Sequence, residues 1–137
     1  MMHPRFFDIL ALFRKMNPVI STNGHFLDAG SCHRLASSGM RKIIIPYDGV
    51  TPEVYIKYRR GGDHKRVTEG ILNLATAIRE QRSSMKIELQ FLLHRGNEHE
   101  KAEVAAFAGS IGARFRVKSM QVLDNERHPD AEAGKDG

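Results

Sequence analysis

The chain has 137 residues, of which 41% are hydrophobic and 27% charged, so its composition is that of one ordinary globular domain. Its apolar runs are far shorter than a bilayer span and its first residues do not follow the pattern of a signal peptide, so we expect neither a transmembrane helix nor a leader. The net charge of +5 comes from scattered lysines and arginines; this indicates a solvated basic surface, leaves weak attraction to polyanions open, and predicts no specific nucleic-acid site.

The first part of the chain predicts a helix, a strand and a second helix. Apolar residues recur at helical spacing over residues 4–15. The segment NPVIST, residues 17–22, has the composition of a strand. A helix should follow, with Asp28 as its N-cap and Gly39 as its stop.

The second repeat of this pattern begins with KIIIPY, residues 42–47, which reads as a buried strand. A short helix should start at Thr51, because threonine is a suitable N-cap and a proline follows it. After two glycines, Asp63 is in position to cap a longer amphipathic helix.

The last repeats begin with KIELQFLLH, residues 86–94, in which apolar and polar residues alternate as in a strand. Asn97 and Glu100 have the spacing of a capping box for the next helix. A final strand is expected over residues 114–122, and the polar residues 124–137 should form a disordered tail after a single domain of residues 1–123.

Strands that alternate with helices predict an α/β fold with about four parallel strands and helices on the outer face. In such folds ligands bind beyond the carboxyl ends of the strands. Asn23, Gly24, Asp48, Gly49 and Asn97 all follow predicted strands, so they form a candidate site. Turn and cap formation is the alternative explanation, because Asn, Asp and Gly serve those roles in any α/β protein.

Three motifs carry a family resemblance: TNG after the first strand, DGVTPEVYIKYRRGGD after the second, and IELQFLLHRGNEHE at the third. In this order and spacing they resemble radical S-adenosylmethionine (radical SAM) enzymes, in particular the subgroup that carries a SPASM accessory domain. The resemblance covers about residues 2–122 and implies an incomplete TIM-like barrel.

The same resemblance implies a cofactor pair that this chain matches only in part. Radical SAM enzymes cleave S-adenosylmethionine at a 4Fe-4S cluster held by three closely spaced cysteines. This chain has neither the three-cysteine motif nor the Gly-Gly-Glu-Pro segment that contacts S-adenosylmethionine. We therefore expect no cluster in this chain, and only weak binding of S-adenosylmethionine.

By resemblance, the cofactor-binding positions are Thr22, Asn23, Gly24, Asp48, Gly49 and Gln90. Gln90 would point into the lumen of a closed barrel; otherwise it is a polar residue on an open face. Pro46 stands where the family has a serine that helps to hold S-adenosylmethionine. Proline has no hydroxyl and no N–H, so we expect weaker cofactor binding and a loosened strand end.

The sequence predicts no metal site and no catalytic residue. Cys32 is the one cysteine, so no internal disulfide can form, which favours a cytoplasmic location. One thiolate cannot hold an iron–sulfur cluster. His94 and His99 lack the spacing of metal ligands.

Besides weak electrostatic binding of polyanions, two functions remain open. The chain is either a piece of a radical SAM enzyme that is inactive alone, or a non-catalytic module that pairs with another barrel half. Both predict open sheet edges, and hence a partner chain or a homo-oligomer that completes the barrel.

Overall fold

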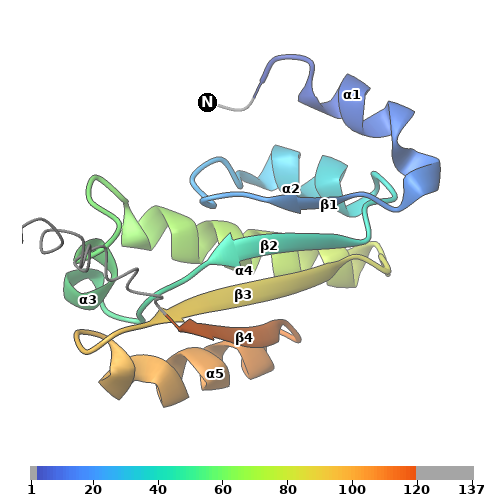
Figure 1. The fold of residues 1–137 in the computed structure, drawn as a ribbon. Helices are drawn as coiled ribbons and strands as arrows, with labels where there is room; N and C mark the ends of the chain where they lie inside the picture. Colours follow the sequence, from blue (N-terminus) through green and yellow to red (C-terminus); the bar gives the residue numbers. More distant parts are fainter. Residues whose placement is uncertain (1–2, 120–137) are drawn as a thin grey trace, which may run out of the picture.

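The computed structural model describes residues 3–119, and these form a four-stranded parallel sheet with helices packed against it (Figure 1). The strands pair in sequence order, β1-β2-β3-β4. The α/β prediction with four parallel strands is confirmed, and the arrangement is consistent with part of a TIM-like barrel. In chain order the elements are α1 (Phe6–Leu12), η1 (Arg14–Met16), β1 (Val19–Ser21), α2 (Ala29–Ala36), β2 (Lys42–Pro46), α3 (Pro52–Ile56), α4 (His64–Glu80), β3 (Lys86–Leu93), η2 (Glu98–Glu100), α5 (Lys101–Ser110) and β4 (Arg114–Ser119).

The core lies between one face of the sheet and the helices. Alternate residues of β2 and β3, such as Ile43, Ile45, Leu89 and Phe91, are fully buried. Figure 1 shows α2 and α4 behind the sheet and α5 beside β4. The opposite face carries residues of mixed polarity, because successive side chains of a strand point to opposite faces.

Two of the predicted helix caps are present. The Asp28 carboxylate accepts the Ser31 N–H at 2.9 Å, and the Asp63 carboxylate accepts the Arg66 N–H at 3.0 Å. Gly39 adopts φ = +79° after α2, in the left-handed region that glycine favours. Local sequence signals were sufficient here because both partners of each cap lie within one helical turn.

Three sequence expectations need correction. The first helix is shorter than expected: α1 ends at Leu12 and a 3-10 turn follows. Thr51 stands at the N-cap position of α3, but its hydroxyl makes no bond within that helix. Asn97 and Glu100 do not form a capping box, because a 3-10 turn separates Asn97 from α5 and both side chains bond elsewhere.

Pro46 does not disturb the pairing of β2 with β3. The ladder runs through Pro46, which pairs with Gln90, and the next N–H, of Tyr47, donates to the Gln90 carbonyl at 2.8 Å. The missing N–H of Pro46 faces the other neighbour, β1, whose paired register already ends at Ser21. A proline is therefore tolerated here, and the expectation of a loosened strand end is wrong for the β3 side.

Two expectations lie outside the described residues: the end of the last strand beyond Ser119 and the polar tail at 124–137. Within residues 3–119, no helix has both the length and the apolar character that a membrane crossing requires.

Candidate functional site

The candidate site residues occupy three separate places on the sheet. Thr22, Asn23 and Gly24 follow β1, Asp48 and Gly49 follow β2, and Gln90 lies within β3. All belong to the carboxyl-end half of the sheet. Each group has its own set of hydrogen-bond partners.

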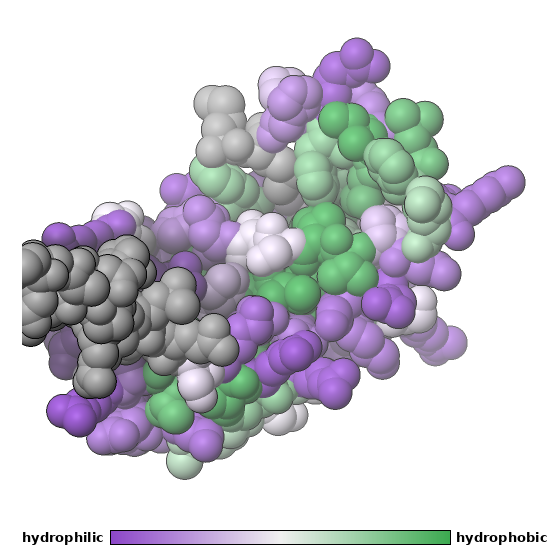
Figure 2. All heavy atoms as spheres, in the orientation of Figure 1, coloured by the Kyte–Doolittle hydropathy of each residue, from purple (hydrophilic) through white to green (hydrophobic). Residues whose placement is uncertain are grey.

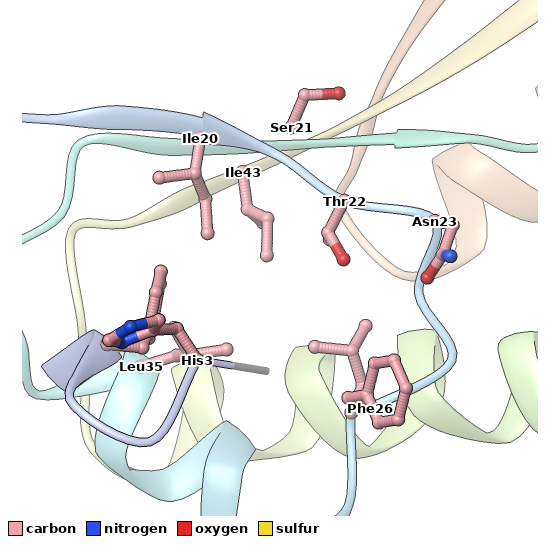
Figure 3. A pocket seen from close by; sticks show the side chains of 10 residues that line it. His3, Ile20, Ser21, Thr22, Asn23, Phe26, Leu35 and Ile43 are labelled. Carbon is pink, nitrogen blue, oxygen red and sulfur yellow. The ribbon is translucent and has the colours of Figure 1, made fainter. Parts of the chain in front are cut away.

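Thr22 and Asn23 of the group after β1 line a cavity of about 590 Å³ at the edge of the sheet (Figure 3). Figure 3 shows Ile20 and Ile43 pointing toward Leu35 on α2, whereas Ser21 points to the other side. The cavity therefore lies between the sheet and the helical layer. Its lining is His3, Phe6, Ile20, Ser21, Thr22, Asn23, Phe26, Leu27, Leu35 and Ile43.

The polar side chains of this group fold back onto their own turn. The Thr22 hydroxyl accepts the Gly24 N–H at 3.2 Å, and the Asn23 side-chain oxygen accepts the His25 N–H at 3.1 Å. Such local bonds are those that Asn and Thr make in turns. Each side chain keeps further polar capacity, so a ligand in the cavity can still reach them.

Position 24 requires glycine because of its backbone conformation and because of close steric contacts. It has φ = +81°, and a Cβ there would lie 3.1 Å from Val67 Cγ1 and 3.3 Å from Ile45 Cγ2. The turn thus brings the backbone close to α4 and β2, which a side chain would prevent.

Asp48, after β2, is almost completely buried, at 1% exposure. One carboxylate oxygen accepts the Leu92 N–H at 2.9 Å and the other accepts the Arg59 Nε–H at 2.9 Å. Asn97 completes the link, because its amide donates to the Asp48 carbonyl at 3.1 Å and to the Leu92 carbonyl at 2.9 Å. This acidic turn therefore joins the end of β2 to the end of β3.

Glu100 makes a second link to the same turn. Its carboxylate accepts the Val50 N–H at 2.6 Å, the Thr51 N–H at 3.2 Å and the Thr51 hydroxyl proton. Burial raises the pKa of Glu100, but these hydrogen bonds outweigh burial and hold the pKa below its usual value. Gly49 is required beside it, since a Cβ would lie 2.8 Å from a Glu100 carboxylate oxygen.

Gln90 lies on the face of the sheet that the helices leave open, next to a buried carboxylate. Its amide donates to Glu88 at 3.1 Å, and Lys42 Nζ donates to the other Glu88 oxygen at 2.9 Å. Arg116 lies 3.9 Å from Glu88, whose side chain has no exposed surface. The hydrogen bond from Lys42 lowers the pKa of Glu88 despite burial, so this carboxylate is ionised at neutral pH.

Sequence reasoning missed the partners of Gln90. The alternation of KIELQFLL places Glu88 and Gln90 on one side of β3, and this signal was available. The register that sets Ile44 opposite Glu88, and Gln90 opposite Arg116, was not available. Without that register, Lys42 and Arg116 could not be assigned to the cluster.

The donors of this chain do not fit an iron–sulfur cluster. Cys32 has no exposed surface: it lies on α2 with its side chain in the hydrophobic core, and its sulfur is 3.8 Å from the Gly70 carbonyl oxygen. Burial raises the pKa of this thiol to about 12, so it stays protonated, whereas cluster iron is bound by thiolates. Within residues 3–119, no three His, Cys, Asp or Glu side chains are grouped to hold a metal ion.

No protein-family model matches the chain. Two curated relatives do, both named GTP 3',8-cyclase 3, from Mycobacterium bovis and Mycobacterium tuberculosis. Each is 33% identical over 105 residues, which are 75% of this chain and 26% of the relative, so the chain spans about a quarter of their length. GTP 3',8-cyclases are radical SAM enzymes, and the match therefore supports a relation between this chain and the radical SAM superfamily.

Proposed function

We propose that this chain supplies part of the barrel of a radical SAM enzyme of the SPASM-associated type and is inactive alone. The observation that carries the proposal is its single thiol: Cys32 is buried and protonated, so it cannot bind cluster iron as a thiolate. The order of the TNG, DGVTPEVY and IELQFLLHRGNEHE motifs supports the subgroup. A lone cysteine also suits a reducing, cytoplasmic setting.

In this proposal S-adenosylmethionine binds weakly at the rim. The Asp48 carboxylate already accepts protein donors on both oxygens, so Thr22, Asn23 and Gln90 carry the remaining side-chain capacity for a ligand. Pro46 removes one further donor from the same rim. A site with so few available polar groups gains little specific binding free energy.

Anaerobic reconstitution of the purified chain with iron and sulfide tests the cluster part of the proposal. We expect the wild type and a Cys32→Ser variant to show the same low background of bound iron and no cluster absorbance. A stable cluster in the wild type that the Cys32→Ser variant loses would overturn the proposal. Calorimetric titration with S-adenosylmethionine tests the rim: saturable weak binding that an Asn23→Ala, Gln90→Ala pair reduces is expected, and no heat at millimolar ligand excludes a cofactor role for the rim.

A second candidate function is pairing with another barrel half, either a partner chain or a second copy. The supporting observation is an apolar surface beside the edge strand β1. Figure 2 shows hydrophobic residues around α1 and over the β1 side of the sheet. The exposed apolar residues of this region are Ile9, Leu12, Phe13, Met16 and Val19.

Light scattering after gel filtration tests this candidate. We expect the wild type to self-associate with rising concentration and the pair Leu12→Glu, Met16→Glu to remain monomeric. The pair Ile56→Glu, Leu72→Glu is the matched control, because both are exposed apolar residues outside this region. A wild type that stays monomeric at high concentration rules out the homo-oligomer, and equal effects of both variants rule out a specific role for this surface.

A further inference from the structure

The amino ends of three strands surround a basic hollow, at the end of the sheet opposite the candidate site. Its volume is about 510 Å³, within the range of small-molecule sites. Figure 2 shows mainly hydrophilic residues over this end of β2, β3 and β4, at the right of the view. Four of the lining residues are cationic and none is acidic; the lining is Arg41, Lys42, Lys86, Ile87, Gly112, Ala113 and Arg114.

Only one of the four cations has a salt-bridge partner in the described part of the chain. Lys42 donates to Glu88 at 2.9 Å, which neutralises it. Arg41, Lys86 and Arg114 form no salt bridge with any residue of the range 3–119. Three positive charges therefore border one hollow without a carboxylate to balance them.

The negative ends of the helix dipoles do not cancel this positive surplus. The carboxyl ends of α2, α4 and α5 lie at the same end of the sheet, because each helix leads back to the start of the next strand. Each helix end is equivalent to about half a negative charge, or about −1.5 for the three. Arg82, in the loop that leads into β3, adds one positive charge and Glu80, at the end of α4, adds one negative charge, so the three unpaired cations still exceed the charge of the helix ends.

The backbone around the hollow is fixed and leaves room at its centre. The Arg41 N–H donates to the Pro18 carbonyl at 2.9 Å, and the Lys86 N–H donates to the Arg41 carbonyl at 3.0 Å. Gly112, at φ = +70°, has no side chain, and a Cβ there would have no neighbour within 4 Å. The cations are thus mounted on rigid strand starts around an open space, an arrangement suited to binding an anion.

We propose that this hollow binds the di- or triphosphate group of a small molecule, either as free polyphosphate or as part of a nucleotide. Two guanidinium groups can bind phosphate oxygens in a bidentate manner, and the Lys86 ammonium adds a third cation. A linear polyphosphate presents several charges over the width of the hollow, whereas a single phosphate can engage only part of the set. The inference does not depend on the radical SAM relation, since it rests on the other end of the sheet.

Calorimetric titration of the full chain with inorganic pyrophosphate at physiological salt tests the proposal, with inorganic phosphate and ADP as the other two probes. We expect saturable binding of pyrophosphate that is stronger than binding of phosphate. The triple variant Arg41→Gln, Lys86→Gln, Arg114→Gln should weaken it by about tenfold or more, since each lost charged hydrogen bond costs affinity. ADP binding as tight as pyrophosphate identifies the phosphates as the recognised group, and tighter ADP binding indicates a nucleotide.

The matched control removes the same charge elsewhere: Arg60→Gln, Lys65→Gln, Lys101→Gln, all exposed and all near the carboxyl ends of the strands. This control should retain wild-type affinity within about twofold, because exposed charges act over only about 8 Å at physiological salt. Equal losses in both triples, or no wild-type binding at millimolar pyrophosphate, would overturn the proposal. Amide shift mapping of the wild type gives a readout independent of the variants: changes at residues 41, 86 and 112–114 support the site, and changes spread over the whole surface refute it.

Discussion

Replacing Glu100 should destabilise the chain far more than replacing an exposed carboxylate on the same turn. The carboxylate is 4% exposed and accepts the Val50 N–H at 2.6 Å, the Thr51 N–H at 3.2 Å and the Thr51 hydroxyl proton. Hydrogen bonds to charged groups contribute about 1.5–3 kcal/mol each. The longest of the three is weak, so Glu100→Ala should lower the free energy of unfolding by about 3–5 kcal/mol and Glu100→Gln by about 1–3 kcal/mol.

Urea unfolding followed by circular dichroism measures this difference, with Glu98→Gln as the control. Glu98 is an exposed carboxylate on the same turn, so its substitution should change stability by less than about 0.5 kcal/mol. Because the pKa of Glu100 is lowered in the folded chain, its contribution is complete above the unfolded pKa and is lost as the pH falls through the folded pKa. The gap between wild type and Glu100→Gln should therefore close in acid. A gap that is absent at neutral pH, or that does not change in acid, refutes the reasoning.

Three further results are expected. Gly49→Ala should lower the free energy of unfolding by about 1–3 kcal/mol, because its Cβ would lie 2.9 Å from Val54 Cγ1. Gly109→Ala should raise it by up to about 1 kcal/mol, because Gly109 lies in a helix and a Cβ there would have no neighbour within 4 Å. The midpoints of urea unfolding measure both changes, and equal midpoints for the two variants contradict the expectation. Glu88→Gln should make stability depend less on pH, because the hydrogen bond from Lys42 lowers the pKa of Glu88 in the folded chain. Urea unfolding in acid and at neutral pH measures this difference, and the same pH dependence in wild type and variant contradicts it. Cys32 should react with a thiol reagent only after unfolding, because it is buried with a pKa of about 12; rapid labelling of the native chain contradicts this.

The elements of this fold were largely predictable because their signals are local. Alternation gave the buried face of β3, and Asp28 and Asp63 cap helices that begin one residue later. The errors in the helix caps arose where a polar side chain has a distant partner. Asn97 and Glu100 have the spacing of a capping box, yet they bind groups about 50 residues earlier in the chain. No local pattern distinguishes these two outcomes.

For the candidate site, too, the positions of residues along the strands could be predicted from the sequence, whereas their hydrogen-bond partners could not. The sequence placed Thr22 and Asp48 near strand ends, which is correct, but it could not say which of their polar atoms were already bonded. Only the pairing register reveals that Asp48 reaches the Leu92 N–H and that Glu88 lies between Lys42 and Arg116. A residue's position in a parallel sheet is thus easier to predict than its remaining capacity to bind a ligand.

That remaining capacity differs between the two ends of the sheet. At the carboxyl ends, both oxygens of the buried carboxylates of Asp48 and Glu100 already accept hydrogen bonds from protein donors. A ligand there must compete with bonds that hold the loops together, and breaking them leaves buried groups unpaired at a cost of about 1–3 kcal/mol each. At the amino ends, Arg41, Lys86 and Arg114 border an open hollow, and an anion gains their attraction without breaking any salt bridge formed within residues 3–119. Asp48 and Glu100 therefore hold strands and loops in register, whereas Arg41, Lys86 and Arg114 remain available to a charged ligand at the opposite end.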